Sequence, residues 1–223
     1  MLTITLVRHG NTDANKKRII QGQLETELNE TGRAQAAAVG RRLAQDIIDK
    51  IYCSDLVRCK QEKTMEGIIQ YHDEKPPVAF LESIRERGFG NLQGMLLSKI
   101  ARESSKRKIS FDEMIKLEGG ELESEFGKRV VEGYQEIVND ALEHGYNHIL
   151  VVTHGGPLRV LTHHWTFEAQ YRNITAEDIR SHGNTAVTRV QISDKDRRGL
   201  VEVVGCIKHL EESQVQVEAP PAV

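Results

Sequence analysis

Two short apolar runs in the sequence end in the same way, with a histidine followed by glycine. Thr3–Val7 leads into Arg8-His9-Gly10, and Ile149–Val152 leads into Thr153-His154-Gly155-Gly156. Both runs have the β-branched composition of buried strands, and ligands of open α/β sheets bind beyond the strand C-termini. Glycine lets backbone N–H groups approach an anion, and the charge of Arg8 at a buried strand end needs a partner. The two strand ends therefore predict a phosphate pocket.

Each of these residues also has a simpler structural interpretation. His9 or His154 taken singly is more often a hydrogen-bonded histidine at a strand end. Arg58 follows a third predicted strand and is expected one turn into a helix, where it could face the same sheet edge or be an ordinary surface arginine. Glu86 lies between two arginines in a glycine-rich segment, so it could be a proton donor or a salt-bridged surface residue.

Taken together, the residues resemble the histidine phosphatase superfamily, the phosphoglycerate mutase-like proteins. The resemblance follows the right order over nearly the whole chain. It rests on Arg8-His9-Gly10 with Asn15, Gln21-Gly22, Leu28 and Thr31-Gly32, on Ser54-Asp55-Leu56 with Arg58, on Arg85-Glu86-Arg87 with Gly90, on Gly119-Gly120-Glu121, and on Thr153-His154-Gly155-Gly156.

The resemblance implies a role for each matched residue. His9 would be the nucleophile that forms a phosphohistidine, and Glu86 would protonate the leaving oxygen. The groups implied to hold the phosphoryl group are Arg8, Arg58 and His154, and those implied to bind substrate are Asn15, Gln21, Gly22 and a backbone amide near Gly155. The chemistry agrees, because a neutral imidazole can attack phosphorus in line. Two arginines and a protonated histidine would stabilise the equatorial oxygens without a metal ion or other cofactor.

The sequence departs from the family pattern in ways that bear on function. Cys59–Thr64 looks like a two-residue insertion after Arg58, and Gln93-Gly94 replaces the frequent Glu-Gly. Met95–Lys108 lacks the basic insertion with which the cofactor-dependent mutases hold a bisphosphate. The lack of that basic insertion favours a phosphatase. Ile19-Ile20-Gln21-Gly22 and the segment around Gly119-Gly120-Glu121 resemble the fructose-2,6-bisphosphatase-like and broad-specificity branches. Phosphoglycerate mutase-type transfer and phosphoprotein hydrolysis remain alternatives.

Three other classes of protein fit the sequence less well. Cys53 and Arg58 are separated by one residue fewer than in cysteine phosphatases. A metallohydrolase could use ligands from the set His9, His154, His163, His164 and Asp55. However, the adjacent His163 and His164 lie in a predicted helix and would point apart. A catalytically idle sugar-phosphate sensor would not need both His9 and Glu86.

The composition sets limits on location and partners. The chain has 223 residues, 39% hydrophobic and 28% charged, which suffices for one sizeable core. The net charge of −3 gives no general affinity for nucleic acid or anionic membranes. No apolar run approaches the roughly 18–20 residues that span a bilayer, and three irregularly spaced cysteines imply no disulfide framework. We expect a cytoplasmic or nuclear enzyme that acts on a small phosphorylated metabolite; its oligomeric state stays open.

Elements that position these residues can also be predicted. Alternating strands and helices indicate an α/β fold with a mainly parallel central sheet flanked by helices on both faces, and the resemblance implies that this fold is of the phosphoglycerate mutase-like type. The predicted strands are Leu2–Val7, Lys50–Cys53, Val78–Leu81, Ile149–Val152, Thr185–Ile192 and Leu200–Ile207. The predicted helices are Thr31–Gln45, with Thr31 as N-cap, and Leu56–Tyr71, Leu122–His144 and Pro157–Phe167. We expect one domain over residues 1–210, with a small cap at about 82–120, and a disordered tail over 211–223. The charged stretch Arg102–Lys108 is expected to be a solvated helix face.

Overall fold

A computed structural model of the chain describes residues 1–60, 64–180 and 182–215. At its centre is a six-stranded sheet in the order β3-β2-β4-β1-β5-β6. The first four strands in this order are mutually parallel, β5 is antiparallel to β1, and β6 is antiparallel to β5. The strands are β1 (Leu2–Arg8), β2 (Lys50–Ser54), β3 (Val78–Leu81), β4 (His148–Thr153), β5 (Val187–Ile192) and β6 (Gly199–Cys206). The prediction of a mainly parallel central sheet is confirmed.

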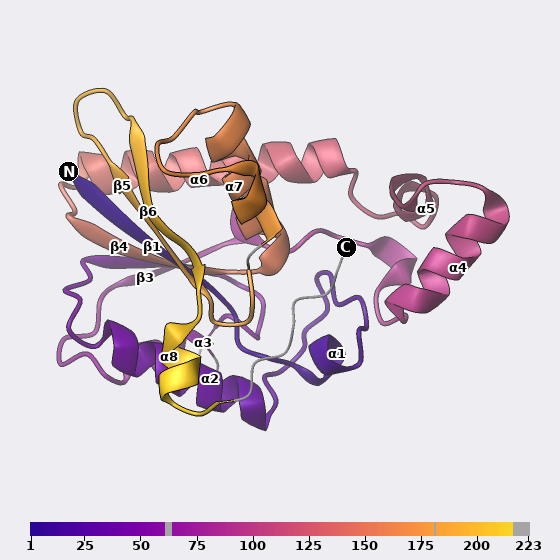
Figure 1. Cartoon of the computed structure of the whole chain (residues 1–223), viewed down its shortest axis with the longest axis horizontal. Coiled ribbons are helices and arrows are strands. Elements are labelled where there is room, and N and C mark those ends of the chain that lie inside the picture. Colours follow the sequence, from indigo (N-terminus) through magenta and orange to yellow (C-terminus); the bar gives the residue numbers. More distant parts are fainter. Residues whose placement is uncertain (61–63, 181, 216–223) are drawn as a thin grey trace.

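Helices cover both faces of this sheet (Figure 1). The α-helices are α1 (Asp13–Lys16), α2 (Glu30–Leu43), α3 (Thr64–Ile69), α4 (Leu97–Arg107), α5 (Phe111–Leu117), α6 (Glu123–Glu143), α7 (Gly155–Phe167) and α8 (Lys208–Glu212). Short 3₁₀ turns lie at η1 (Glu82–Ile84), η2 (Gly90–Leu92) and η3 (Ala176–Arg180). In Figure 1, α6 and α7 lie on one side of the sheet, and α2, α3 and α8 lie on the other.

The central strands are buried on both faces, which explains their nearly continuous apolar sequences. Ile149 and Val151 of β4 pack into the core beneath α6 and α7, whereas Leu150 and Val152 pack into the core beneath α2 and α3. Side chains of a strand alternate between the faces of a sheet, so one strand contributes to both cores. This burial fixes the position at which each strand ends, and hence the residues that follow it.

The start and end of two predicted helices differ from expectation. The N-cap of α2 is Asn29 rather than Thr31, because the Asn29 side chain accepts a hydrogen bond from the backbone N–H of Gly32 at 2.9 Å. The single helix predicted over Leu56–Tyr71 is divided, since residues 55–60 form bends and turns and α3 begins at Thr64. Arg58 therefore lies in a turn, not one turn into a helix. Residues 61–63, where the insertion was inferred, lie outside the described residues.

The least regular part of the sequence forms helices α4 and α5, which lie beyond the C-terminal end of β1 (Figure 1). They enclose a small apolar cluster of their own, formed by Leu92, Ile100, Met114 and Ile115. In the charged stretch Arg102–Lys108, only Ser104 is buried, in agreement with a solvated helix face. The cap expected at about 82–120 thus contains two helices that periodicity did not reveal.

The C-terminal part of the described chain is more ordered than predicted. Helix α8 extends to Glu212, into the region expected to be a disordered tail, and residues up to 215 are described. The rest of that tail, 216–223, lies outside the described residues. Across the part of the chain that the structure describes, no helix combines the length and apolar character needed to cross a membrane.

Candidate active site

The two histidines predicted at strand ends lie side by side in the structure. Strands β1 and β4 are adjacent and parallel, with Arg8 paired to Thr153, so both chains leave the sheet at the same edge. The backbone N–H of His9 donates to the carbonyl oxygen of Thr153 at 2.9 Å. The rings of His9 and His154 meet edge to face, with centroids 5.2 Å apart. The parallel pairing therefore brings the two histidines into one site.

The ring of His9 is held through Nδ1, and its Nε2 makes no hydrogen bond with the backbone of the described residues. His9 is 2% exposed, and its Nδ1 lies 2.7 Å from the carbonyl oxygen of Gly10. Because a carbonyl oxygen only accepts, Nδ1 carries the proton, and the lone pair of a neutral ring is on Nε2. Burial, and then the charges of Arg58 and Arg8, lower the pKa of His9 well below its usual value. His9 is thus a neutral imidazole with its lone pair on Nε2.

Arg58 is almost completely buried, at 1% exposed, and is held by carbonyl groups. Its Nη2 donates to the carbonyl oxygen of Gly22 at 2.6 Å, and its Nη1 donates to that of Leu24 at 2.9 Å. Gly22 has a φ of +52°, and a Cβ there would lie 2.2 Å from Oε1 of Gln93. A side chain at Gly22 would therefore disturb the carbonyl that orients Arg58.

Arg8 is also buried, and its guanidinium has unused donors. Its Nη1 donates to the carbonyl oxygen of His182 at 2.7 Å, while its buried Nε has no hydrogen-bond partner among the described residues. A Cβ at Gly155 would lie 3.3 Å from the guanidinium, so this glycine lies directly against it. Within the described chain, neither Arg8 nor Arg58 forms an ion pair with a carboxylate. Two buried, unneutralised guanidinium groups make a site for an anion.

His154 has a different environment from the one expected of a protonated donor. Its Nδ1 accepts a hydrogen bond from Nε of Arg58 at 3.1 Å, so Nε2 carries the proton and donates to Oγ of Ser54 at 2.7 Å. Burial, followed by the charge of Arg58, lowers the pKa of His154 well below its usual value. In this arrangement the ring is neutral and both of its nitrogens bind protein groups. His154 therefore orients Arg58, and Ser54, a residue of the matched motif to which the sequence assigned no role, supports His154.

Glu86, which follows η1 in the chain, lies against the first turn of α7, near Arg8 and Arg58. Its Oε2 accepts from the backbone N–H of Gly156 at 3.1 Å, and its Oε1 accepts from that of Arg87 at 2.9 Å. Burial lowers the pKa of both Arg8 and Arg58, and the negative charge of Glu86 partly offsets this effect.

The neighbouring arginines of Glu86 point elsewhere. Arg85 forms an ion pair with Asp55, and Arg87 forms ion pairs with Asp112 and Glu123. Neither guanidinium therefore neutralises the Glu86 carboxyl group.

The residues predicted on the substrate side mainly support the loop that follows His9. Oδ1 of Asn15 accepts from the backbone N–H of Thr12 at 3.2 Å, which caps α1. Oε1 of Gln21 accepts from the hydroxyls of Thr12 at 2.9 Å and Thr26 at 2.6 Å. Among the described residues, neither side-chain amide nitrogen donates a hydrogen bond. Both nitrogens can therefore donate to solvent or to a ligand. Gln93, which replaces a frequent glutamate, accepts from the backbone N–H of Gln23 at 2.8 Å.

Two residues at the site come from the segment before β5, which sequence reasoning did not connect with it. Nδ2 of Asn184 donates to the carbonyl oxygen of His9 at 3.0 Å, and His182 supplies the carbonyl that binds Arg8. Because β5 is antiparallel to β1, the beginning of β5 lies at the edge where β1 ends. The polar residues just before β5 are the sequence signal for this contribution, which depends on the antiparallel pairing of β5 with β1.

The geometry does not assemble the other two sites that the sequence left open. Burial raises the pKa of the Cys53 thiol well above its usual value and that of Cys59 to about 12, which disfavours a thiolate nucleophile. Among the described residues, no three His, Cys, Asp or Glu side chains are arranged to hold a metal ion. His163 lies against Phe167, and His164 contacts Glu168, both on α7.

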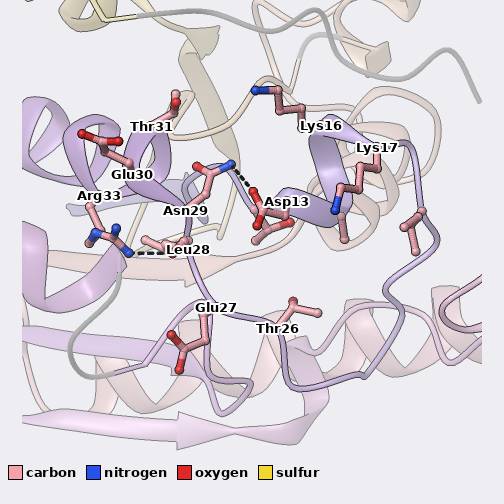
Figure 2. Close-up of a pocket in the computed structure, with 13 residues that line it drawn as sticks. Asp13, Lys16, Lys17, Thr26, Glu27, Leu28, Asn29, Glu30, Thr31 and Arg33 are labelled. Atoms are coloured by element: carbon pink, nitrogen blue, oxygen red, sulfur yellow. Dashed lines mark hydrogen bonds between the residues drawn. The ribbon is translucent and has the colours of Figure 1, made fainter.

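A separate groove of about 750 Å³ lies between α1 and the start of α2 (Figure 2). Lys16, Lys17 and Arg33 contribute positive charges to it, and the carboxylates of Asp13, Glu27 and Glu30 balance them. Thr12 and Thr26 line this groove and also hold Gln21, so it adjoins the loop after His9. Its mixed charge distinguishes it from the site around Arg8 and Arg58.

Comparison with known proteins agrees with this geometry. Residues 4–203 match the family model of the histidine phosphatase superfamily, branch 1. A broad-specificity phosphatase of Saccharomyces cerevisiae is 30% identical over 97% of this chain and 91% of its own length. A metal-independent phosphoserine phosphatase of Arabidopsis thaliana is 35% identical over 93% of this chain and 82% of its own length. The solved structure of YhfR from Bacillus stearothermophilus covers 94% of this chain and all of its own, with a TM-score of 0.75 and 26% identity. With a histidine at the end of β1, two unneutralised arginines beside it and a family match over almost its whole length, the chain belongs to branch 1 of the histidine phosphatase superfamily.

Proposed function

We propose that this protein hydrolyses phosphomonoesters of small metabolites through a phosphohistidine on His9. The observation that carries the proposal is the state of His9: its Nδ1 proton is bound by the Gly10 carbonyl, so that Nε2 is the nucleophile, beside two arginines that lack carboxylate partners. An anion bound between these arginines would place its phosphorus next to a neutral imidazole. This combination favours catalysis over mere binding of the anion.

In the first step, Nε2 of His9 attacks phosphorus in line, forming an N–P bond as the P–O bond to the leaving group breaks. Arg8 and the remaining donor of Arg58 stabilise the equatorial oxygens of the transferring group. Glu86 gives a proton to the leaving oxygen. The alcohol then departs as a neutral molecule.

In the second step, water attacks the phosphohistidine from the side that the alcohol has left. The Glu86 carboxylate accepts a proton from this water as the O–P bond forms and the N–P bond breaks. Orthophosphate is released, and His9 returns to the neutral form with its proton on Nδ1. Each protein group thereby regains its initial state. The overall reaction converts the phosphomonoester and one water molecule into an alcohol and orthophosphate.

The roles of the remaining residues follow from their contacts. His154 orients Arg58 through Nδ1, and Gly22 supplies the carbonyl that fixes the other end of the same guanidinium. Gly155 allows the N-terminus of α7 to approach Arg8. Asn15 and Gln21 position the loop through their carbonyl oxygens and present their amide nitrogens to the substrate.

The names of the relatives support a small phosphorylated metabolite as substrate. One relative is called a broad-specificity phosphatase and another a metal-independent phosphoserine phosphatase. We further propose that hydrolysis needs no metal ion, that the enzyme acts in the cytoplasm or nucleus, and that nucleic acids are not its substrates.

A phosphate-release screen tests the substrate class. Purified protein is incubated with a panel containing phosphoserine, glycerol phosphates, sugar mono- and bisphosphates, phosphoglycerates and a phosphopeptide, and His9→Asn serves as the matched control. We expect orthophosphate release from several small esters by the unsubstituted protein alone. Transfer to a second hydroxyl instead of water would indicate a mutase, and activity confined to the phosphopeptide would contradict the proposal.

A further inference from the structure

Thr185 adopts a backbone conformation that β-branched residues rarely take. Its φ is +54°, in the left-handed region, and the residue is completely buried. Such a conformation is sterically costly for a residue with a branched Cβ. It persists only where the surrounding contacts determine it, and such strain is concentrated at functional sites. Thr185 therefore requires contacts that hold it in place.

The turn that contains Thr185 carries groups that support the proposed nucleophile and its neighbouring arginine. The backbone N–H of Thr185 donates to the carbonyl oxygen of Arg8 at 3.1 Å. Asn184, the residue before it, donates to the carbonyl oxygen of His9 at 3.0 Å. His182, earlier in the same turn, accepts from the Arg8 side chain at 2.7 Å. A displacement of this turn would move the backbone of His9 and the guanidinium of Arg8 together.

His209 of α8 holds the Thr185 side chain from the other side. Nδ1 of His209 lies 3.2 Å from Nη1 of Arg42, which can only donate, so Nε2 of His209 carries the proton. This Nε2 donates to Oγ1 of Thr185 at 3.2 Å. Arg42 also donates to the carbonyl oxygen of Cys206 at 3.1 Å, which ties the end of β6, just before α8, to α2. His209 is 2% exposed, and burial lowers its pKa to about 4, so the ring is neutral at physiological pH.

We propose that His209 is a positioning residue for phosphoryl transfer, which acts by holding the strained Thr185 turn against Arg8 and His9. The inference rests on the proposed function, because it assigns to α8 the support of the His9 nucleophile. His209 does not contact the reacting atoms. His209 holds the Thr185 side chain, and the backbone N–H of Thr185 holds the backbone of Arg8 next to His9.

The test is the rate of phosphoenzyme formation in a single turnover, with excess enzyme and p-nitrophenyl phosphate. His209→Leu fills similar space without a donor, and it should slow the transfer about ten- to hundredfold, the scale for a small misplacement of reacting groups. KM should change little, and His209→Gln, which keeps a donor, should restore most of the rate. His144→Leu is the matched control, because His144 is exposed at the C-cap of α6, where its ring contacts Asp140 and Tyr146.

The decisive comparison is the effect of His209→Leu in a Thr185→Gly background. Glycine adopts a positive φ without steric cost, so the loss caused by His209→Leu should shrink to within about twofold there. An equal loss in both backgrounds, or no loss in the Thr185 background, would overturn the inference. Thr185→Val removes the acceptor hydroxyl without altering α8, and it should reproduce the loss if His209→Leu does not fold. If the unsubstituted protein forms no phosphohistidine at all, the proposed function itself fails, and that outcome is distinct from a missing effect of His209.

Discussion

The carboxyl group of Glu86 accepts a hydrogen bond from the backbone N–H of Gly156 at 3.1 Å, at the first turn of α7. Because Gly156 lies two residues after His154, this contact places Glu86 at the same edge of the sheet as His9. A Cβ at Gly156 would lie 1.9 Å from Oε1 of Glu86, so glycine is required for the approach. The position of Glu86 is therefore set by the backbone N–H groups of Gly156 and Arg87, whereas the guanidinium groups of Arg85 and Arg87 bind other carboxylates.

Replacing Glu86 should affect substrates according to their leaving groups. A sugar alkoxide is strongly basic and needs a proton in the transition state, whereas nitrophenolate leaves without one. We expect Glu86→Gln to slow phosphoenzyme formation by on the order of 10²–10⁴ with glycerol or sugar phosphates, and only mildly with p-nitrophenyl phosphate. Rapid-quench measurement with both substrate classes checks this.

Gly156→Ala provides a second variant for the same prediction. The added methyl group displaces the Glu86 carboxyl group without removing it, so this variant should show the same leaving-group selectivity in a weaker form. Equal slowing with both substrate classes would mean that Glu86 is structural, and another acid would have to be sought near Arg8.

Each buried arginine should contribute strongly to the rate. Replacing Arg8 or Arg58 by alanine removes one preorganised charge donor, which costs on the order of 10²–10³ in kcat/KM. Arg41→Ala, an exposed arginine of α2 that lies over Tyr71, is the matched control and should behave like the unsubstituted enzyme. A loss below about tenfold at Arg58 would show that its guanidinium does not contact the phosphoryl group.

Activity should be independent of added metal ions. The described residues contain no cluster able to hold a metal, and the two arginines supply the positive charge that a metal would otherwise provide. We expect the same kcat with and without excess chelator, measured after dialysis against it. Loss of activity that a divalent ion restores would instead favour a metallohydrolase.

The buried histidines should make the fold sensitive to mild acid. Burial lowers the pKa of His182 and His209 to about 4, and it also lowers those of His9 and His154 well below the usual value. The unfolded chain takes up these protons near pH 6.5, but the folded protein does not. The unfolding free energy should thus have its full value above about pH 7 and fall as the pH drops towards 5. The slope should be up to about 1.4 kcal/mol per pH unit for each histidine.

Urea denaturation at pH 7.5, 6 and 5 measures this slope. His182→Gln should lower it by the share of one histidine. The range stops at pH 5 because the carboxylate of Asp55, whose pKa Arg85 lowers, titrates only in more acidic solution. An unfolding free energy that does not change between pH 7.5 and 5 would contradict the prediction.

The parts of the site that could be predicted are those that follow parallel strands. The buried composition of β1 and β4 fixed where His9 and His154 leave the sheet, and parallel pairing brought them together. The contribution of Asn184 could not be found in this way, because it depends on the antiparallel pairing of β5 with β1.

Two further features lay beyond local sequence patterns for physical reasons. The neutral form of His154 results from the direction in which Arg58 donates, which only tertiary contacts determine. The role of His209 depends on its contact with Thr185, 24 residues earlier in the chain, and the short helix that carries it has little periodicity of its own.

The measurement that tests the central claim most directly is identification of the phosphorylated residue. Enzyme mixed with labelled phosphomonoester is denatured in alkali during turnover, digested at high pH and analysed by mass spectrometry. We predict a phosphate on Nε2 of His9 that is stable to base and labile to acid, and we predict that His9→Asn carries none while keeping its fold. A phosphate on Cys53, Cys59 or a serine, or turnover by His9→Asn at the unsubstituted rate, would contradict the account.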